Sequence, residues 1–195
     1  MKLIDVVELK SGTPQFRLVE TSDPEAPVYC FYGQQELEAD LSGKKRDVNC
    51  AKKIRTYDAV EVLSVGDLVF SLMSGKATLV GECHEGYLLT QNFVKLDPSS
   101  MIDARYLVYL LNEHKGVRRQ LALGQQGSFT MKYTVRQLAD LLIPDLPPRA
   151  TQEAIGSLYF SINRVTALRH DVAEKEKLVA VSYTHLRAHE TKANL

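Results

Sequence analysis

The sequence predicts an α+β fold: a compact domain built on a mixed β-sheet, followed by one long C-terminal α-helix. Short runs rich in β-forming residues fill the chain up to residue 96, and Gly-containing turns separate them. Helical periodicity appears only after residue 103, with no repeated strand–helix alternation and no internal repeat. From residue 151 the apolar residues recur every three or four positions, which indicates one long helix.

The first half of the chain is expected to supply the strands. Residues 4–9 form a short strand or helix that a Ser-Gly-Thr-Pro turn ends. Residues 33–43 are turn-prone at both ends and acidic between, and residues 44–56 are expected to form a long basic loop with at most one short strand. The predicted strands cover residues 27–32, 60–63, 68–72, 77–80 and 87–96, with a turn at residues 97–100.

The second half is expected to be helical. Asp103 is placed to cap a helix that extends to about residue 112, and a second helix follows at residues 117–123. Thr134 stands three residues before Gln137, the spacing of a capping box, so a short helix begins there. Three prolines then end regular structure before the long helix.

The long helix is expected over residues 149–180 and carries an apolar seam. Its members are Ile155, Leu158, Ile162, Val165, Val172 and Val179. Arg169 and Glu176 interrupt the seam. A seam of this kind needs a second helix to bury it, unless the helix lies on its own domain.

Residues 181–195 lack this pattern and resemble a translated adapter sequence, so they are expected to be a non-native or disordered tail. His185 and His189 are four residues apart, but no third ligand is near, and no metal site is predicted.

Composition places the chain among cytoplasmic proteins. Its 195 residues suffice for one domain with its own core and an appendage. No apolar run is long enough to span a membrane, and the opening residues do not form a secretory signal. Three widely spaced cysteines predict reduced thiols.

The charges are segregated although the formal net charge is zero. Residues 20–40 are acidic, whereas residues 44–55 and 115–132 are basic. A neutral balance counts against a simple nucleic-acid binder, but local patches decide where a phosphate backbone can lie. The alternative is that both patches are solvated faces.

No catalytic machinery is visible. The chain lacks a phosphate-binding Gly-Lys loop, a Gly-x-Ser-x-Gly elbow and the motifs of a methyltransferase. Cys83 and His84 are adjacent, so in a strand they would point to opposite faces and could not act as nucleophile and base. No catalytic residue, metal ligand or cofactor is therefore predicted.

Four segments in order resemble the specificity (S) subunits of type I restriction–modification systems. They are residues 3–14, residues 65–71, residues 89–95, and Ile-Pro-Asp-Leu-Pro-Pro at 143–148 followed by a helix that opens near a Gln and an Ile. The resemblance covers roughly residues 2–180. A full subunit of that family carries two target recognition domains, each followed by a long helix. The resemblance thus implies a recognition domain at residues 1–148 and a spacer and dimerisation helix at residues 149–180.

The resemblance also implies a function and partners. Subunits of this family do no chemistry. They read double-stranded DNA and direct a methyltransferase (M) subunit and, through it, a restriction (R) subunit to the target site. A second recognition domain would lie in the same longer chain or in a homodimer. The alternative is a protein-binding or scaffolding module that acts through its coiled-coil-like helix.

DNA-contacting residues are predicted in both basic segments. Phosphate contacts are assigned to Lys44, Lys45, Arg46, Lys52, Lys53 and Arg55, with Lys76 as a weaker candidate. Base reading is assigned to Gln125, Gln126 and Ser128, beside the basic residues Arg118, Arg119 and Lys132. The alternatives are that residues 124–128 are a helix connector without contacts, or that residues 33–55 do the reading.

Overall fold

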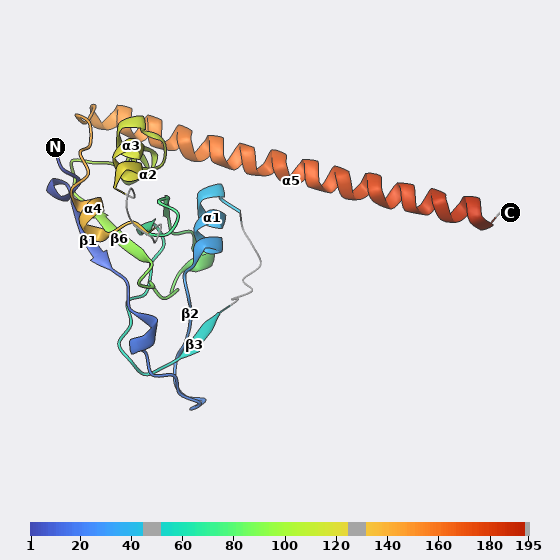
Figure 1. Cartoon of the computed structure of the whole chain (residues 1–195), viewed down its shortest axis with the longest axis horizontal. Helices are drawn as coiled ribbons and strands as arrows, with labels where there is room; N and C mark the ends of the chain where they lie inside the picture. Colours follow the sequence, from blue (N-terminus) through green and yellow to red (C-terminus); the bar gives the residue numbers. More distant parts are fainter. Residues whose placement is uncertain (45–51, 125–131, 194–195) are drawn as a thin grey trace.

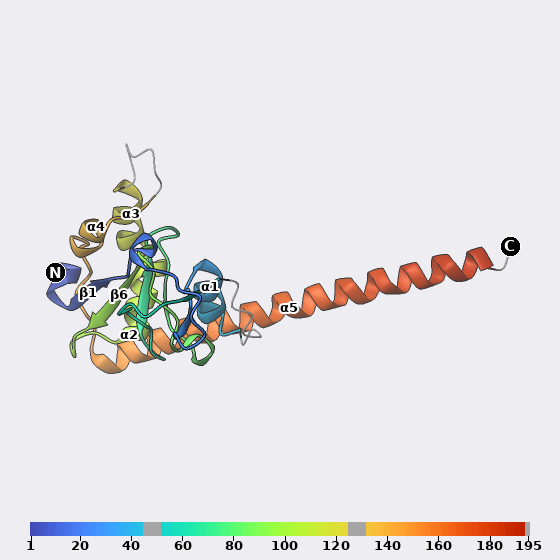
Figure 2. The ribbon, with the colours of Figure 1, turned by 90° about the horizontal axis from the view of Figure 1, so that it is seen from below.

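The strands and shorter helices all precede residue 149 and form a unit that we call the head. One long helix, α5 (Arg149–Ala193), extends far beyond the head in both views (Figures 1 and 2). The computed structural model describes residues 1–44, 52–124 and 132–193, with side chains up to residue 181. The helix continues through the predicted boundary at residue 180 without a break. The predicted α+β fold with a long C-terminal helix is confirmed.

The described strands of the head form two β-sheets. The first is a four-stranded sheet in the order β1 (Val7–Ser11), β6 (Phe93–Pro98), β4 (Leu68–Ser71) and β5 (Ala77–Leu79). The second pairs β2 (Val28–Cys30) with β3 (Lys53–Arg55). All these pairings are antiparallel, and isolated parallel bridges join Thr13 to Thr90 and Phe31 to Leu88. The β-structure is therefore mixed.

Among its described residues, the head also contains four shorter α-helices and three 3₁₀ turns. The α-helices are α1 (Gln34–Ser42), α2 (Ala104–Glu113), α3 (Lys115–Leu123) and α4 (Val135–Ala139). The 3₁₀ turns are η1 (Leu3–Asp5), η2 (Gln15–Arg17) and η3 (Glu82–His84). The predicted caps are confirmed: Asp103 accepts from the Tyr106 amide at 3.0 Å, and Thr134 and Gln137 bond each other's backbone.

Residues 33–43 contain a helix that was not predicted, and the glycines that suggested turns cap it, Gly43 in the left-handed conformation at φ 64°. Three predictions of local structure are wrong. The strand predicted at residues 87–96 begins only at Phe93, and Leu88 and Thr90 before it form isolated bridges. In the segment predicted as a strand at residues 60–63, the structure shows only an isolated bridge from Val62 to Leu88. The turn predicted at residue 97 begins later, since β6 continues to Pro98.

Two apolar clusters fill the head. The larger packs the four-stranded sheet against α2, α3 and α4. The smaller lies under α1 and contains Tyr32, Leu37 and Phe93. Cys30 beside it is disulfide-bonded, so the prediction of reduced thiols is wrong there, whereas Cys83 is free.

Within the described part of the chain, none of the helices combines the length and the hydropathy that crossing a bilayer requires.

Candidate nucleic-acid interface and helix root

A pocket of about 590 Å³ opens between the N-terminus of α1, the β4–β5 turn and the residues before β6. Three aromatic side chains form part of its lining: Phe31, Tyr32 and Phe93. Its polar lining is dominated by amides and hydroxyls, which are those of Gln15, Gln34, Gln35, Asn92, Ser71, Ser74 and Thr90. Amide side chains can read base edges in DNA, because each presents both a donor and an acceptor.

A buried polar cluster holds α1 in place beside this pocket. Asp40 of α1 accepts a hydrogen bond from the Tyr32 hydroxyl at 2.8 Å and lies 2.8 Å from Nδ1 of His84. The Asp40 and His84 side chains are only 3% and 8% exposed. Burial, with Asp40 next to the hydroxyl, raises the pKa of Tyr32 well above its ordinary value. Tyr32 therefore stays a neutral donor, and it links the pocket wall to the body of α1.

The two basic segments predicted to contact DNA meet at this pocket. Lys52 donates to Oε1 of Gln15 at 3.0 Å, and its Nζ lies 5.1 Å from the centre of the Phe31 ring. Lys132 donates to Oδ1 of Asn92 at 3.5 Å. One lysine from each segment thus reaches an amide of the same pocket, although the two lie 80 residues apart in the sequence.

Several other predicted cations are held by the protein itself. Lys44 pairs with Asp171 of α5, and this hydrogen bond lowers the pKa of the Asp171 carboxyl. Arg118 donates to the Gly75 carbonyl at 2.7 Å, which ties α3 to the β4–β5 turn. Lys76 lies 3.7 Å from Glu113, and Arg55 donates to the Asp23 carbonyl at 3.0 Å.

Of the remaining predicted residues, Lys53 and Arg119 are exposed. The others lie outside the described residues: Lys45, Arg46, Gln125, Gln126 and Ser128.

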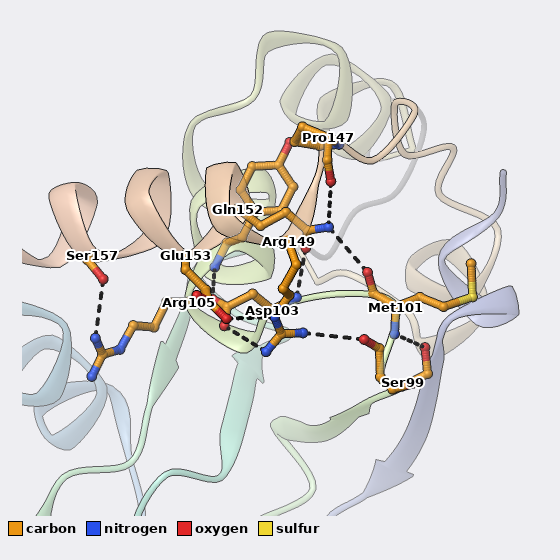
Figure 3. A network of polar contacts seen from close by, with 11 residues as sticks. Ser99, Met101, Asp103, Arg105, Pro147, Arg149, Gln152, Glu153 and Ser157 are labelled. Carbon is orange, nitrogen blue, oxygen red and sulfur yellow. Dashed lines mark hydrogen bonds and ion pairs between the residues drawn. The ribbon is translucent and has the colours of Figure 1, made fainter.

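The root of α5 is fixed to the head by a buried amide (Figure 3). Gln152 is 2% exposed and uses both ends of its side chain. Its Oε1 accepts from the Asp103 amide at 2.8 Å, while its Nε2 donates to the carbonyls of Met101 at 3.2 Å and Pro147 at 2.9 Å. The start of α2 and the start of α5 are therefore joined through one side chain.

Charged contacts and a glycine complete this root. Arg149 bonds Asp103 at 3.2 Å and Glu153 at 2.9 Å (Figure 3). Gly156 faces α2, where an added Cβ would lie 2.6 Å from Cβ of Arg105 and 2.7 Å from the Tyr106 nitrogen. The two helices approach closely because this position has no side chain.

The predicted apolar seam divides between two environments. Ile155 packs partly buried against the core of the head. Of the other predicted members, Val179 is 69% exposed, and Leu158, Ile162, Val165 and Val172 are between 46% and 60% exposed. Leu168 is 47% exposed, and we call Leu158, Ile162, Val165, Leu168 and Val172 the α5 stripe. It turns away from the head contacts that Gln152, Gly156 and Arg164 make.

The sequence interpretation named none of the four pocket amides, which are Gln15, Gln34, Gln35 and Asn92, although Gln34 and Gln35 lie in the segment 33–55 that it kept as the alternative reading site. A signal for these two was present. Gly33-Gln34-Gln35 repeats the Gly-Gln-Gln tripeptide at residues 124–126 that was chosen as the reading loop. Gln15 and Asn92 carry no such signal, because only the fold brings them to α1.

In the portion of the chain with described coordinates, no group of three or more His, Cys, Asp or Glu side chains could hold a metal ion.

Comparison with known proteins finds solved structures with a similar architecture. No protein-family model matches the sequence, and no curated protein matches it significantly. Among solved structures, the HsdS subunit from Thermoanaerobacter tengcongensis aligns with a TM-score of 0.54 and 17% identity, over 89% of this chain and 39% of that chain. The type I restriction–modification S subunit from M. genitalium aligns with a TM-score of 0.50 and 16% identity, over 81% and 37%.

A third structure, which concerns complex assembly and conformational transition of the type I R-M system, aligns with a TM-score of 0.58 and 18% identity. That match covers 92% of this chain and 42% of the other. This chain thus spans about two fifths of the length of the solved chains it matches. The resemblance inferred from the sequence is confirmed at the level of the fold: the head and its long helix have the architecture of type I specificity subunits.

Proposed function

We propose that this chain is a DNA sequence-recognition component of a type I restriction–modification complex. The observation that carries the proposal is the likeness in fold to two solved S subunits, which extends over 89% and 81% of this chain. In this proposal residues 1–148 act as a target recognition domain, and residues 149–180 act as a spacer and dimerisation helix. The component itself performs no chemistry.

The chemistry of the head supports this role. Lysines from two distant segments reach one amide-lined pocket, and these are the two kinds of side chain that DNA readers combine. Cationic side chains hold phosphates and supply the salt-dependent affinity, whereas amides select bases. Lys53 and Arg119 are also exposed, and in this proposal they contact phosphates.

The α5 stripe supports the assembly that the proposal requires. Five aliphatic side chains on one helix face are about half exposed, and a soluble protein gains stability when a second helix covers such a face. The proposed occupant is the corresponding helix of a second recognition domain, in the same longer chain or in a homodimer. The proposed partners are an M subunit and, through it, an R subunit, in the cytoplasm.

Binding to duplex DNA at increasing salt tests the proposal. We expect the logarithm of the binding constant to fall linearly with the logarithm of salt concentration, by roughly 0.9 for each phosphate neutralised. Lys53→Ala and Arg119→Ala together should weaken binding to every sequence alike and reduce the slope by about 2, because both side chains are exposed and hold no pocket amide. The matched control is Lys115→Ala with Lys177→Ala, two exposed lysines on α3 and α5 outside the pocket.

Binding that is absent, or independent of salt, would contradict DNA recognition. If α5 still associated with another helix under those conditions, the chain would instead be a scaffolding module.

A further inference from the structure

The amides of the pocket differ in how much of their hydrogen-bonding capacity the protein already uses. Gln34 is engaged at both ends: its Oε1 accepts from Ser71 at 3.2 Å, and its Nε2 donates to Glu38 at 3.1 Å. Gln15 and Asn92 are engaged at their oxygens, by Lys52 and Lys132. Gln35 is exposed, and no hydrogen bond joins its amide to another described residue.

The internal hydrogen bonds of each amide determine which base edge it can still recognise. An amide with both ends open can accept from N6 and donate to N7 of adenine in the major groove. An amide whose oxygen already accepts from a lysine is oriented with its two NH₂ donors free, and it suits guanine, which presents the two acceptors O6 and N7. An amide bonded at both ends inside the protein is fixed in orientation, and it can rotate toward a base only by giving up an internal bond.

The position of Gln35 also suits a base-reading role. It belongs to the first turn of α1, whose start is fixed by the hydrogen bond from the Gly33 amide to Glu36 at 3.0 Å. The body of the helix is held by Asp40 through Tyr32 and His84. Because the backbone at this position is held firmly, the Gln35 side chain cannot shift to form hydrogen bonds with a wrong base. Its position therefore favours selection between bases.

We propose that this pocket is the base-reading site of the chain, with Gln35 reading adenine and the lysine-held amides Gln15 and Asn92 reading guanine. The proposal rests on the DNA-recognition function proposed above and adds to it the residues and the bases. It also explains why four amides occur in one pocket. Gln34 shapes the wall, Gln15 and Asn92 are oriented by lysines, and Gln35 is left open for the ligand.

Selection from a pool of random-sequence duplex DNA, followed by sequencing of the bound fraction, tests this inference with the full chain. Gln35→Ala should reduce the preference for adenine at one position about tenfold, which corresponds to one lost bidentate contact. Gln15→Ala should reduce the preference for guanine at a different position. Affinity for unselected DNA and its salt slope should change less than twofold in Gln35→Ala, since no charge is removed.

Gln120→Ala is the matched control, because it removes an amide outside the pocket. Gln120 lies on α3, where its amide bonds the backbone of Leu142 at 2.8 Å. This control should keep the base preferences of the unmodified chain. Thermal melting of each variant identifies any that fail to fold, and Gln35→Ala should melt like the unmodified chain because Gln35 is exposed.

Two negative results have different meanings. If the unmodified chain selects a sequence and Gln35→Ala selects the same one with equal stringency, the base-reading assignment is wrong and DNA recognition stands. If the unmodified chain binds no duplex or enriches no sequence, the proposed function itself is wrong.

Discussion

The two faces of α5 are built from different chemistry. The face toward the head presents Gln152, Gly156 and Arg164, which act through hydrogen bonds and close backbone approach. The other face presents the α5 stripe, whose aliphatic side chains are about half exposed. The helix is therefore attached to its own head by polar residues, by Gly156 and by the partly buried Ile155, Tyr159 and Phe160, whereas the α5 stripe stays exposed.

The largest expected effect is on the polar face. Gln152→Ala should lower the free energy of unfolding of the head by about 2–3 kcal/mol, because the Asp103 amide and two carbonyls lose a buried partner. Thermal melting should record a decrease of roughly 5–10 °C. The control is Thr151→Ala at the neighbouring, exposed position. An unchanged melting temperature would show that solvent replaces the amide and that the root is not held by it.

Gly156→Ala tests the close approach on the same face. The added methyl group meets Cβ of Arg105 and the backbone of Tyr106, which cannot move aside without shifting α2. Overpacking lowers the free energy of unfolding by about 1–3 kcal/mol, and the higher helix propensity of alanine raises it by up to about 1 kcal/mol. We expect a net loss of about 1 kcal/mol by denaturant unfolding, against no loss in the exposed Thr151→Ala. A stabilised variant would mean that the two helices separate freely.

The opposite face is tested by charge. Ile162→Asp with Val165→Asp should abolish self-association or binding of a partner helix, and it should leave the head folded, because both side chains are exposed. Sedimentation of the two proteins at high concentration measures this, with Thr166→Asp as a control at an exposed polar position of α5. A stable monomer in the unmodified chain would refute the stripe as an association surface.

The smallest effect is expected at the end of α5. Removing residues 181–195 should change neither the melting temperature nor partner binding, because the composition of that segment departs from the helix pattern before it. The matched comparison is the full chain measured in parallel. A melting temperature lower by several degrees would show that the segment contributes to stability.

Sequence periodicity identified α5 but not the face that contacts the head. A pattern of Ile, Leu and Val reports where apolar side chains gather, and on α5 most of that seam turns away from the domain. The contacting face is marked by Gln152 and Gly156, whose roles depend on the backbone of residues 101–106. The local caps at Asp103 and Thr134 were predictable, because a cap needs only neighbours in sequence.

The candidate site was predictable only in part. The basic segments could be recognised as segments, but only the fold distinguishes Lys52, which reaches the pocket, from Lys44, which bonds Asp171. The pocket amides at residues 15, 35 and 92 come from distant parts of the chain, and their convergence depends on the bridges that join residues 13 and 31 to residues 88–90.

The short helix α1 has a mechanical consequence for the whole molecule. Its first turn lines the pocket, while Gly43 and Lys44 beyond its last turn contact Arg164 and Asp171 of α5. Nine helical residues span about 14 Å, the length of roughly four base pairs of duplex. α1 thus connects the pocket to the long helix. In the proposed function, a duplex that contacts the pocket could not rotate relative to α5 without breaking a contact at one end of α1.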